Sequence, residues 1–232
     1  MNKKIVFFNG IEIYFDDASP DLALLVSETF GKQVYNIGSI VVSDKDIVYD
    51  VGAAIGDTAL YYASFGAKVL AFEPMEDRFE FLKRNILINE RLKDRIMLIN
   101  AVVGEGKEVV GYENFYGLKK YEPKGIMADK LTVKKTLKTV RLDSGLKFVG
   151  YDKPTIVKID VEGYEVEVLL GAGGILRDFK PKILAEIHNI RNLYSFNAIL
   201  EAFKYQLVAI SQPRIFREGG FDLCLTGYWK AD

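Results

Sequence analysis

The feature that most constrains this chain is a regular alternation, from residue 47 onward, of apolar strand-like runs with amphipathic helical segments. The expected strands cover residues 47–53, 68–72, 96–103, 155–160 and 183–187, and the expected helices cover residues 57–65, 76–89, 164–170 and 193–203. The strands are near-continuous apolar runs, as a parallel sheet covered by helices on both faces requires. The alternation therefore predicts a doubly wound α/β domain over residues 47–232.

The two ends of the chain depart from this alternation. Residues 1–46 are expected to form an accessory segment, with a β-hairpin of strands 6–8 and 11–15 around a type I′ turn at Asn9-Gly10. A helix should follow, with Ser19 as its N-cap and Gly31 at its end. Near the other end, strands at 205–211 and 223–229 have no helix between them, which predicts a terminal antiparallel hairpin.

Residues 104–154 interrupt the alternation and are interpreted as an insertion. Short strand-like pieces at 107–112 and 139–142 flank a polar loop, and seven lysines fall within residues 119–138. An insertion of this length in an α/β domain is often a substrate loop. Two interpretations stay open: a solvated surface loop, or a site for a polyanionic or phosphorylated substrate.

Composition excludes several classes of protein. With a net charge of −1 and a pI near 6.0, the protein has no overall positive charge that would attract it to nucleic acid or to an acidic membrane. The single cysteine, Cys224, excludes an intramolecular disulfide and cysteine metal clusters. No apolar run approaches the roughly 20 residues that cross a bilayer, and the N-terminal residues lack the apolar core of a signal peptide. We therefore expect a cytoplasmic protein with no membrane segment.

The loop after the first strand of the domain points to a small-molecule ligand, because ligands of open α/β sheets bind beyond the carboxyl ends of the strands. Gly52 and Gly56 allow the backbone to turn sharply and approach a ligand closely. They are four residues apart with no third glycine in register, so this is not a dinucleotide-binding fingerprint. Asp50 would repel a pyrophosphate but suits a ligand that carries an ammonium or sulfonium group.

Glu73 ends the second strand, 23 residues beyond Asp50, where an acidic residue can accept hydrogen bonds from both ribose hydroxyls. The two signals together indicate an adenosine-type ligand, and the glycine spacing favours S-adenosylmethionine over NAD. Asn100 and Ala101 end the third strand and are expected to line the adenine pocket. The candidate cofactor-binding residues are Asp50, Gly52, Gly56, Asp57, Thr58, Glu73, Pro74, Asn100 and Ala101.

The run DVGAAIGDTALYYASFGAKVLAFEP, residues 50–74, resembles the cofactor half of the FkbM family of S-adenosylmethionine-dependent methyltransferases. The runs KIDVEGYE at 158–165 and KPKILAEIH at 180–188 are similar to that family's later motifs, so the resemblance covers about residues 48–190. The DVEG-type motif is its most specific part. Ala54 is a departure, since the family usually has asparagine there.

The resemblance implies a Rossmann-like class I methyltransferase fold with a mostly parallel seven-strand sheet. It also implies transfer of a methyl group to a hydroxyl oxygen on a sugar or sugar-bearing small molecule. One alternative is an RNA methyltransferase that uses the same cofactor and binds RNA through the lysines of residues 119–138. The other is a non-catalytic cofactor-binding module. Neutral net charge argues against nucleic acid. The sequence says nothing about the oligomeric state.

Four titratable residues are candidates for catalysis, because a hydroxyl acceptor benefits from a base that takes its proton. Asp160 ends the fourth strand and Glu162 follows two residues later, while Glu186 and His188 have the same spacing at the end of the fifth strand. We expect these four side chains to converge on one site at the carboxyl ends of the two strands, with Asp160 or His188 as the base. A metal ion bound by Asp160, Glu162 and His188 is conceivable from their residue types, but the spacing alone does not specify one, so no metal site is assigned.

Lys158 is the remaining candidate, because it lies within an otherwise apolar strand and a buried ammonium needs a partner. We predict an ion pair with Asp160 or with another carboxylate of the site.

Overall fold

The computed structural model describes residues 2–6, 10–16, 27–32, 40–112, 134–143, 150–188, 190–211, 214–216 and 222–231. The chain divides into two compact units, of which the first comprises residues 1–100 and 147–158 and the second comprises residues 101–146 and 159–232. Strand β9 (Ile156–Ile159) contributes residues to both units. The expected boundary at residue 46 stays a prediction.

Seven strands follow one another in a hydrogen-bonded sheet, in the order β11-β13-β10-β9-β3-β4-β5. A short eighth strand, β12 (Arg214–Phe216), pairs with β13 beside this path. The predicted α/β, Rossmann-like fold is confirmed, as is the terminal antiparallel pair, β11 (Tyr205–Ile210) with β13 (Asp222–Ala231). Strand β13 also pairs antiparallel with β10 (Lys182–Ile187), which the sequence did not reveal.

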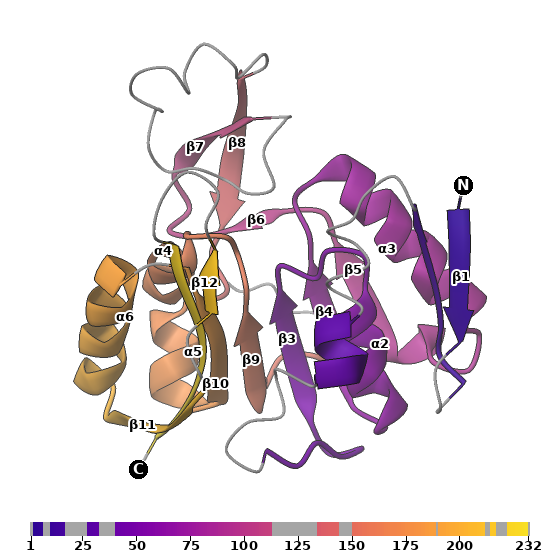
Figure 1. Cartoon of the computed structure of the whole chain (residues 1–232). Coiled ribbons are helices and arrows are strands. Elements are labelled where there is room, and N and C mark those ends of the chain that lie inside the picture. The colour runs from indigo at the N-terminus through magenta and orange to yellow at the C-terminus, as the bar shows by residue number, and fades with distance from the viewer. Residues whose placement is uncertain are drawn as a thin grey trace. The chain divides into compact units, whose positions relative to one another are not determined.

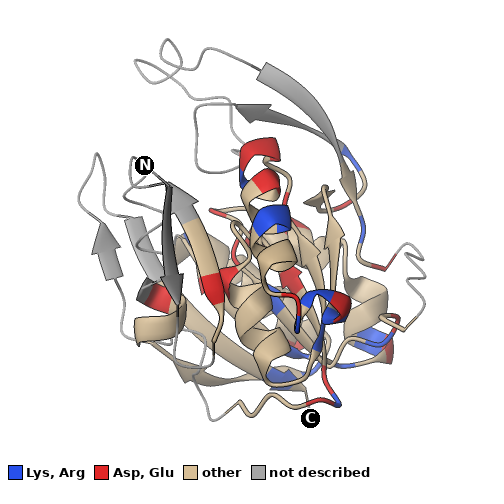
Figure 2. Ribbon diagram, turned by 90° about the vertical axis from the view of Figure 1, so that its right-hand side faces the viewer, with Lys and Arg blue, Asp and Glu red and all other residues tan. Residues whose placement is uncertain are grey.

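The first unit has a parallel core of β3 (Ile47–Val51), β4 (Lys68–Phe72) and β5 (Ile96–Ile99). Four of the five residues in each of β3 and β4 are buried, as expected for a sheet covered on both faces. Helix α2 (Asp57–Ser64) packs on β3 and β4. Helix α3 (Glu76–Ile88) carries interspersed acidic and basic residues along its length, which are red and blue on the ribbon of Figure 2.

The N-terminal hairpin, β1 (Asn2–Val6) with β2 (Glu12–Asp16), packs against α3. Two asparagines of α3 hold β2: Asn89 Oδ1 accepts from the Glu12 N–H at 2.9 Å, and Asn85 Oδ1 accepts from the Tyr14 N–H at 2.7 Å. The hairpin is confirmed, but its register pairs Val6 with Glu12, a longer connection than the predicted two-residue turn. Residues 7–9 lie outside the described residues.

The remaining elements of the first unit are a six-residue π-helical turn, η1 (Ser27–Lys32), and a short 3₁₀ helix, η2 (Lys93–Arg95). The turn η1 matches the end of the helix expected to stop at Gly31, and residues 17–26 lie outside the described residues. The expected strand 96–103 is wrong as one element, because β5 ends at Ile99 and a separate strand, β6 (Val102–Val103), follows.

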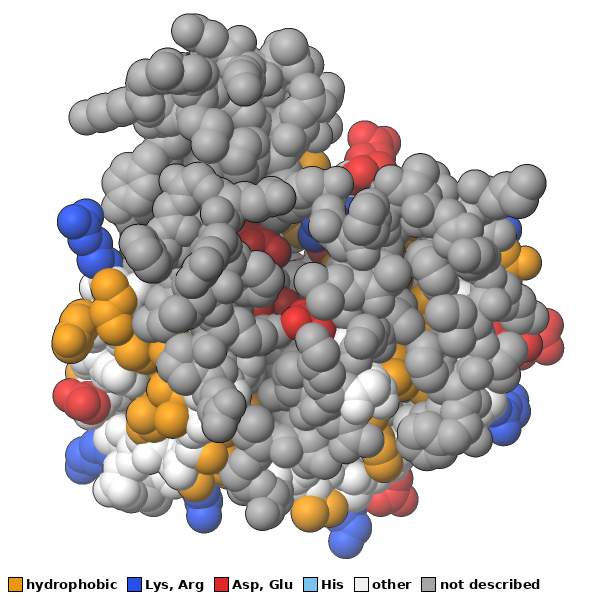
Figure 3. Space-filling view, in the orientation of Figure 1, with side chains coloured by type: hydrophobic (Ala, Val, Ile, Leu, Met, Phe, Trp, Pro, Cys, Tyr) orange, Lys and Arg blue, Asp and Glu red, His pale blue; other side chains and the backbone are white. Residues whose placement is uncertain are grey.

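In the second unit, α4 (Glu165–Leu170), α5 (Gly173–Asp178) and α6 (Ile190–Ala202) accompany the antiparallel strands. Helix α6 packs on β10, β11 and α4, and Figure 1 shows it in light orange beside α5. Hydrophobic side chains are exposed along α6 and β11, visible at the left edge of Figure 3. They are Ile190, Tyr194, Leu207, Val208 and Ile210.

The two ends of the insertion are joined in the second unit. Strand β6 pairs in parallel with β8 (Lys134–Val140), and β8 pairs antiparallel with β7 (Glu108–Tyr112). The Gly104 N–H donates to the Val140 carbonyl at 2.9 Å, and the Asp143 N–H donates to the Gly171 carbonyl at 3.2 Å. Residues 113–133, which include most of the lysines, lie outside the described residues, so the role of the lysines stays a prediction. Among the described residues, no helix is long and apolar enough to span a bilayer.

Candidate active site

The carboxyl end of β3 carries a buried ion pair. The Asp50 side chain is fully buried, and its Oδ1 lies 3.1 Å from the Nζ of Lys158, a side chain that is 2% exposed. Lys158 also donates to the Gly52 carbonyl at 2.8 Å, and the Thr58 hydroxyl donates to Asp50 Oδ2 at 2.6 Å. The predicted ion pair of Lys158 with a site carboxylate is therefore confirmed, with Asp50 as the partner. Through these contacts, the Lys158 ammonium links β9 to the start of the glycine loop.

The loop between β3 and α2 turns through left-handed backbone conformations. Gly52 has φ 84° and Gly56 has φ 91°, and a Cβ added to Gly56 would lie 2.6 Å from a methyl carbon of Leu82. Glycine is needed at Gly56 for both reasons. Ala54 also lies in the left-handed region, with φ 46°. Asparagine tolerates this region better than alanine, so the usual family residue at this position has a conformational reason.

Glu73 directly follows β4, and its side chain is hydrogen-bonded to this loop. Its side chain is buried, with Oε2 accepting from the Ala54 N–H at 2.9 Å and Oε1 from the Met75 N–H at 2.8 Å. Burial raises the pKa of Glu73 to about 7, although these backbone hydrogen bonds act in the opposite direction. Asn100 Nδ2 donates to the Glu73 carbonyl at 2.9 Å, which fixes the backbone that carries this carboxylate.

Two predicted cofactor residues are held by neighbouring side chains or backbone. Asp57, at the start of α2, is buried, and its Oδ2 accepts from the Thr29 hydroxyl of η1 at 2.5 Å. Burial raises the pKa of Asp57 to about 6. The Pro74 carbonyl lies 3.4 Å from Asn100 Nδ2. Eight of the nine predicted cofactor residues thus belong to the first unit, and Ala101 belongs to the second.

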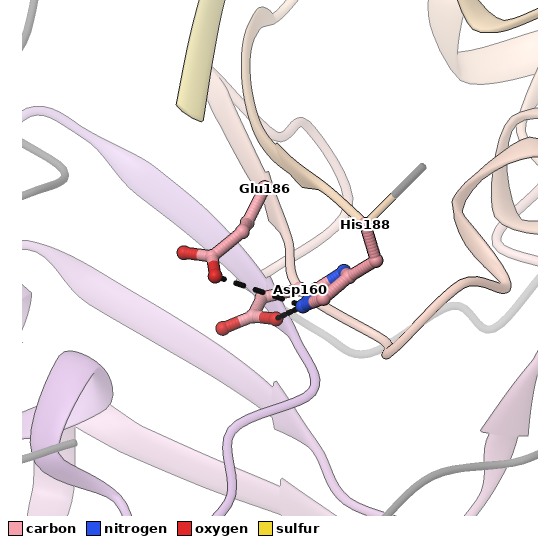
Figure 4. A group of neighbouring side chains, drawn as sticks. All are labelled: Asp160, Glu186 and His188. Carbon is pink, nitrogen blue, oxygen red and sulfur yellow. Dashed lines mark ion pairs between the residues drawn. The ribbon is translucent and has the colours of Figure 1, made fainter. Parts of the chain in front are cut away.

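A cluster of a histidine and carboxylates lies in the second unit. Figure 4 shows Asp160, which follows β9, with Glu186 and His188 from the end of β10, their side chains pointing toward one another. His188 Nε2 lies 3.7 Å from Asp160 Oδ1, 3.6 Å from Glu186 Oε1 and 3.4 Å from Glu162 Oε2. The four residues that we expected to converge on one site therefore lie close together. Their catalytic roles stay a prediction.

The orientation of the His188 ring is set by a residue that the sequence analysis missed. Glu165, at the start of α4, is fully buried, and its Oε1 lies 2.8 Å from His188 Nδ1. Glu165 also accepts from the Gly163 N–H at 2.7 Å and from Asn192 Nδ2 at 2.7 Å. An acidic residue in the first turn of a helix is common for dipole reasons alone, so its sequence position carried no signal of this contact.

The charges around His188 decide its protonation. Burial by itself lowers the pKa of His188, but the hydrogen bond to Glu165 and the charges of Glu162 and Asp160 outweigh burial and raise the pKa to about 10. With this surrounding, the imidazole holds its proton at neutral pH. Glu162, with its side chain 46% exposed, is the most accessible carboxylate of the cluster, and its backbone has φ 53°.

A family model matches this chain. It is described as the methyltransferase FkbM domain and covers residues 50–212. The chain is 31% identical over 149 residues to the hexuronic acid methyltransferase AglP of Haloferax volcanii, covering 62% of this chain and 57% of AglP. It is 26% identical over 202 residues to the AMB antimetabolite synthetase AmbE of Pseudomonas aeruginosa, covering 71% of this chain and 9% of AmbE. The chain thus spans just over half of one curated relative and a small part of the other.

Two solved structures are similar in fold. A methyltransferase FkbM from Methylobacillus flagellatus has a TM-score of 0.57 and 20% sequence identity, covering 92% of this chain and 56% of that chain. TYW2 of M. jannaschii in complex with AdoMet has a TM-score of 0.55 and 15% identity, covering 100% of this chain and 87% of that chain. The family model covers well over half of the 232 residues. The chain therefore belongs to the FkbM family of methyltransferases.

Proposed function

We propose that the chain is an S-adenosylmethionine-dependent O-methyltransferase that acts on a hydroxyl of a sugar or sugar-bearing small molecule. The observation that carries this proposal is the pair of buried carboxylates, Asp50 and Glu73, that flank a glycine loop at the carboxyl ends of two adjacent parallel strands. This is the edge of an open α/β sheet at which ligands bind.

The residues of this edge fit the proposed cofactor. Glu73 keeps lone pairs beyond the two that its backbone partners use, so it can accept hydrogen bonds from ribose hydroxyls. The left-handed turns at Gly52 and Gly56 allow close approach of the backbone to a ligand. S-adenosylmethionine held there would supply a methyl group on a sulfonium, whose carbon–sulfur bond breaks with the electron pair remaining on sulfur.

The acid–histidine cluster of the second unit is proposed to bind the acceptor. His188 is kept protonated by its neighbours, so of the two candidate bases Asp160 is the better acceptor for the hydroxyl proton. Protonated His188, oriented by Glu165, would donate a hydrogen bond to a polar group of the acceptor. Carboxylates at such a site also accept hydrogen bonds from the other hydroxyls of a sugar.

The acceptor class is supported by the relative AglP, which is named a hexuronic acid methyltransferase. We extend to this chain only the general class, a sugar hydroxyl. A cytoplasmic location is part of the proposal.

The cofactor is tested by calorimetric titration of S-adenosylhomocysteine, with NAD beside it, into wild type, Glu73→Ala and Glu76→Gln. Glu76 is exposed on the first turn of α3, three residues away, and serves as the matched control. We expect micromolar binding of S-adenosylhomocysteine by wild type and control, loss in Glu73→Ala, and no binding of NAD. Binding of NAD alone, or of neither ligand, would overturn the cofactor assignment.

The reaction is tested by incubating the protein with S-adenosylmethionine carrying a labelled methyl group and a panel of hexuronic acids, neutral sugars and glycosides. We expect transfer of label to a hydroxyl of at least one carbohydrate and a large loss of kcat in Asp160→Asn with cofactor affinity unchanged. Label found only on RNA would favour an RNA methyltransferase. Cofactor binding with no transfer to any acceptor would favour a binding module.

A further inference from the structure

We propose that Asp160, Glu186 and His188 form a binding site for one divalent cation of the Mn²⁺ type. Each of the three offers one ligand atom, and these atoms all lie within 4.8 Å of one another (Figure 4). The residues come from the ends of β9 and β10, so the strands themselves fix their separation. The spacing along the sequence gave no such site, because Glu186, not Glu162, completes the set.

The first supporting observation is the orientation of the imidazole. Histidines that bind metal ions commonly donate the second ring N–H to a carboxylate, which fixes the ring and its tautomer. His188 Nδ1 has this partner in Glu165, a side chain with no exposed surface that is held in turn by Gly163 and Asn192. Among the contacts of His188 with described residues, only this one is a hydrogen bond. Nε2 is therefore the atom presented to Asp160 and Glu186.

The second observation is the spacing around Nε2. With ligand bonds of about 2.2 Å, neighbouring ligand atoms on an octahedral cation such as Mn²⁺ lie about 3.1 Å apart, and those on a tetrahedral cation about 3.6 Å apart. Nε2 lies 3.7 Å from Asp160 Oδ1 and 3.6 Å from Glu186 Oε1. These separations exceed hydrogen-bond length and lie about 0.5 Å beyond the octahedral spacing, so small side-chain rotations would bring the ligand atoms onto one cation.

The third observation is a buried hydroxyl beside the cluster. Thr226 of β13 lies directly opposite Glu186 in the β10–β13 pair, so both side chains leave the sheet on the same face. Its side chain has no exposed surface, and its Oγ1 has no hydrogen-bond partner among the described residues. An unsatisfied buried hydroxyl is unfavourable. A hydrated cation next to Glu186 would give this hydroxyl a water molecule as partner.

The ligand chemistry selects the type of cation. Carboxylates suit Mg²⁺, Ca²⁺ and Mn²⁺, whereas imidazole suits transition metals, so a set of two carboxylates and one imidazole favours Mn²⁺. A divalent charge also balances the two carboxylates. The cation would take the place of the proton on Nε2.

The role of the cation in catalysis rests on the proposed function, whereas its binding does not. A bound cation polarises a coordinated hydroxyl and lowers its pKa. In this metal-bound state, Asp160 and His188 are ligands and no longer the base and the hydrogen-bond donor proposed for the metal-free cluster. The hydroxyl proton would then pass to Glu162, whose side chain is 46% exposed. The acceptor class is then a sugar that can coordinate a cation through its hydroxyls.

The test measures Mn²⁺ binding directly, by the electron paramagnetic resonance signal of free Mn²⁺ during titration of chelator-treated full-length protein. Wild type should bind one Mn²⁺ per chain. Glu186→Gln and His188→Asn should abolish binding, and Glu201→Gln, an exposed carboxylate on α6, should not change it. Glu165→Gln tests a positioning residue and should weaken Mn²⁺ binding tenfold to a hundredfold. Circular dichroism of each variant shows whether the protein is folded, and calorimetry with S-adenosylhomocysteine tests the cofactor site separately.

A further variant keeps the proposal testable if the charged variants do not fold. Thr226→Val preserves shape and removes the hydroxyl, so it should fold and should weaken Mn²⁺ binding. Wild type that binds S-adenosylhomocysteine but no Mn²⁺ would overturn the cation site and leave the proposed function standing. Mn²⁺ binding that all variants retain would also overturn it. Mn²⁺ binding without S-adenosylhomocysteine binding would leave the site standing and overturn the cofactor assignment.

Discussion

Replacing Lys158 by methionine should destabilise the protein far more than replacing an exposed lysine. Methionine keeps the length of the side chain but removes the ammonium that lies 3.1 Å from Asp50 Oδ1. Asp50 would then be a fully buried carboxylate that keeps the Thr58 hydroxyl as a hydrogen-bond donor but has lost its countercharge. Breaking a buried ion pair by removing one partner costs about 3–5 kcal/mol, because the remaining charge stays desolvated. The free energy of unfolding should fall by that amount.

The same reasoning predicts strong coupling between the two residues. Asp50→Asn alone should also destabilise, since it leaves the ammonium of Lys158 buried. The double variant removes both charges, so it should lose less stability than the sum of the two single losses, by about 2 kcal/mol or more.

Urea unfolding, monitored by circular dichroism, gives the free energy of unfolding of wild type, of the two single variants and of the double variant. Lys45→Met, an exposed lysine in a turn before β3, is the control and should change stability by less than about 0.5 kcal/mol. The reasoning is refuted if Lys158→Met costs no more than Lys45→Met, or if the coupling energy is zero within error. Loss of the Lys158 hydrogen bond to the Gly52 carbonyl would lower the stability of the single variant without creating coupling to Asp50.

Three further predictions concern the cofactor loop. Ala54→Gly should raise the free energy of unfolding by about 0.5–1 kcal/mol because it relieves a left-handed backbone at φ 46°, and an unchanged urea midpoint would count against this strain. Gly56→Ala should lower stability by about 1–3 kcal/mol, since its Cβ would lie 2.6 Å from Leu82, and calorimetry should show weaker S-adenosylhomocysteine binding. Burial raises the pKa of Glu73 to about 7, and the ionised form is the better acceptor for ribose hydroxyls. S-adenosylhomocysteine affinity should therefore fall as pH decreases through 7, and titrations from pH 6 to 8 should find this dependence lost in Glu73→Gln.

The strands and helices of the first unit were predictable because their signals are local. The apolar runs of β3 and β4 are bounded by glycine and polar residues, and α2 and α3 begin and end within one residue of the expected positions. The break between β5 and β6 was not predictable, since it depends on Asn100 bonding to the end of a neighbouring strand. Helix α5 was missed because it begins with Gly173-Gly174, which indicates a loop in sequence.

The residues of the candidate site that lie at strand ends were predictable from the sequence. The residue whose role depends on its burial was not. Asp160, Glu186 and His188 follow from the rule that ligands bind at the carboxyl ends of strands. Glu165 does not, because an exposed helix-start carboxylate and a buried partner of histidine look alike in sequence. Ala54 stands out in sequence only as a departure from the family's usual asparagine, whereas its backbone N–H hydrogen bond to Glu73 and its left-handed conformation are properties of the main chain.

The joined ends of the insertion have a consequence for how freely the length of the chain between them can change. The pairing of β6 with β8 and the hydrogen bonds from the Gly104 and Asp143 N–H groups fix the described ends of the insertion. The Gly174 N–H adds a third tie, to Asp143 Oδ2 at 3.0 Å. Lengthening a loop between fixed ends costs little free energy. The insertion can therefore change in length while β6, β8 and the strands of the parallel core keep their sequence.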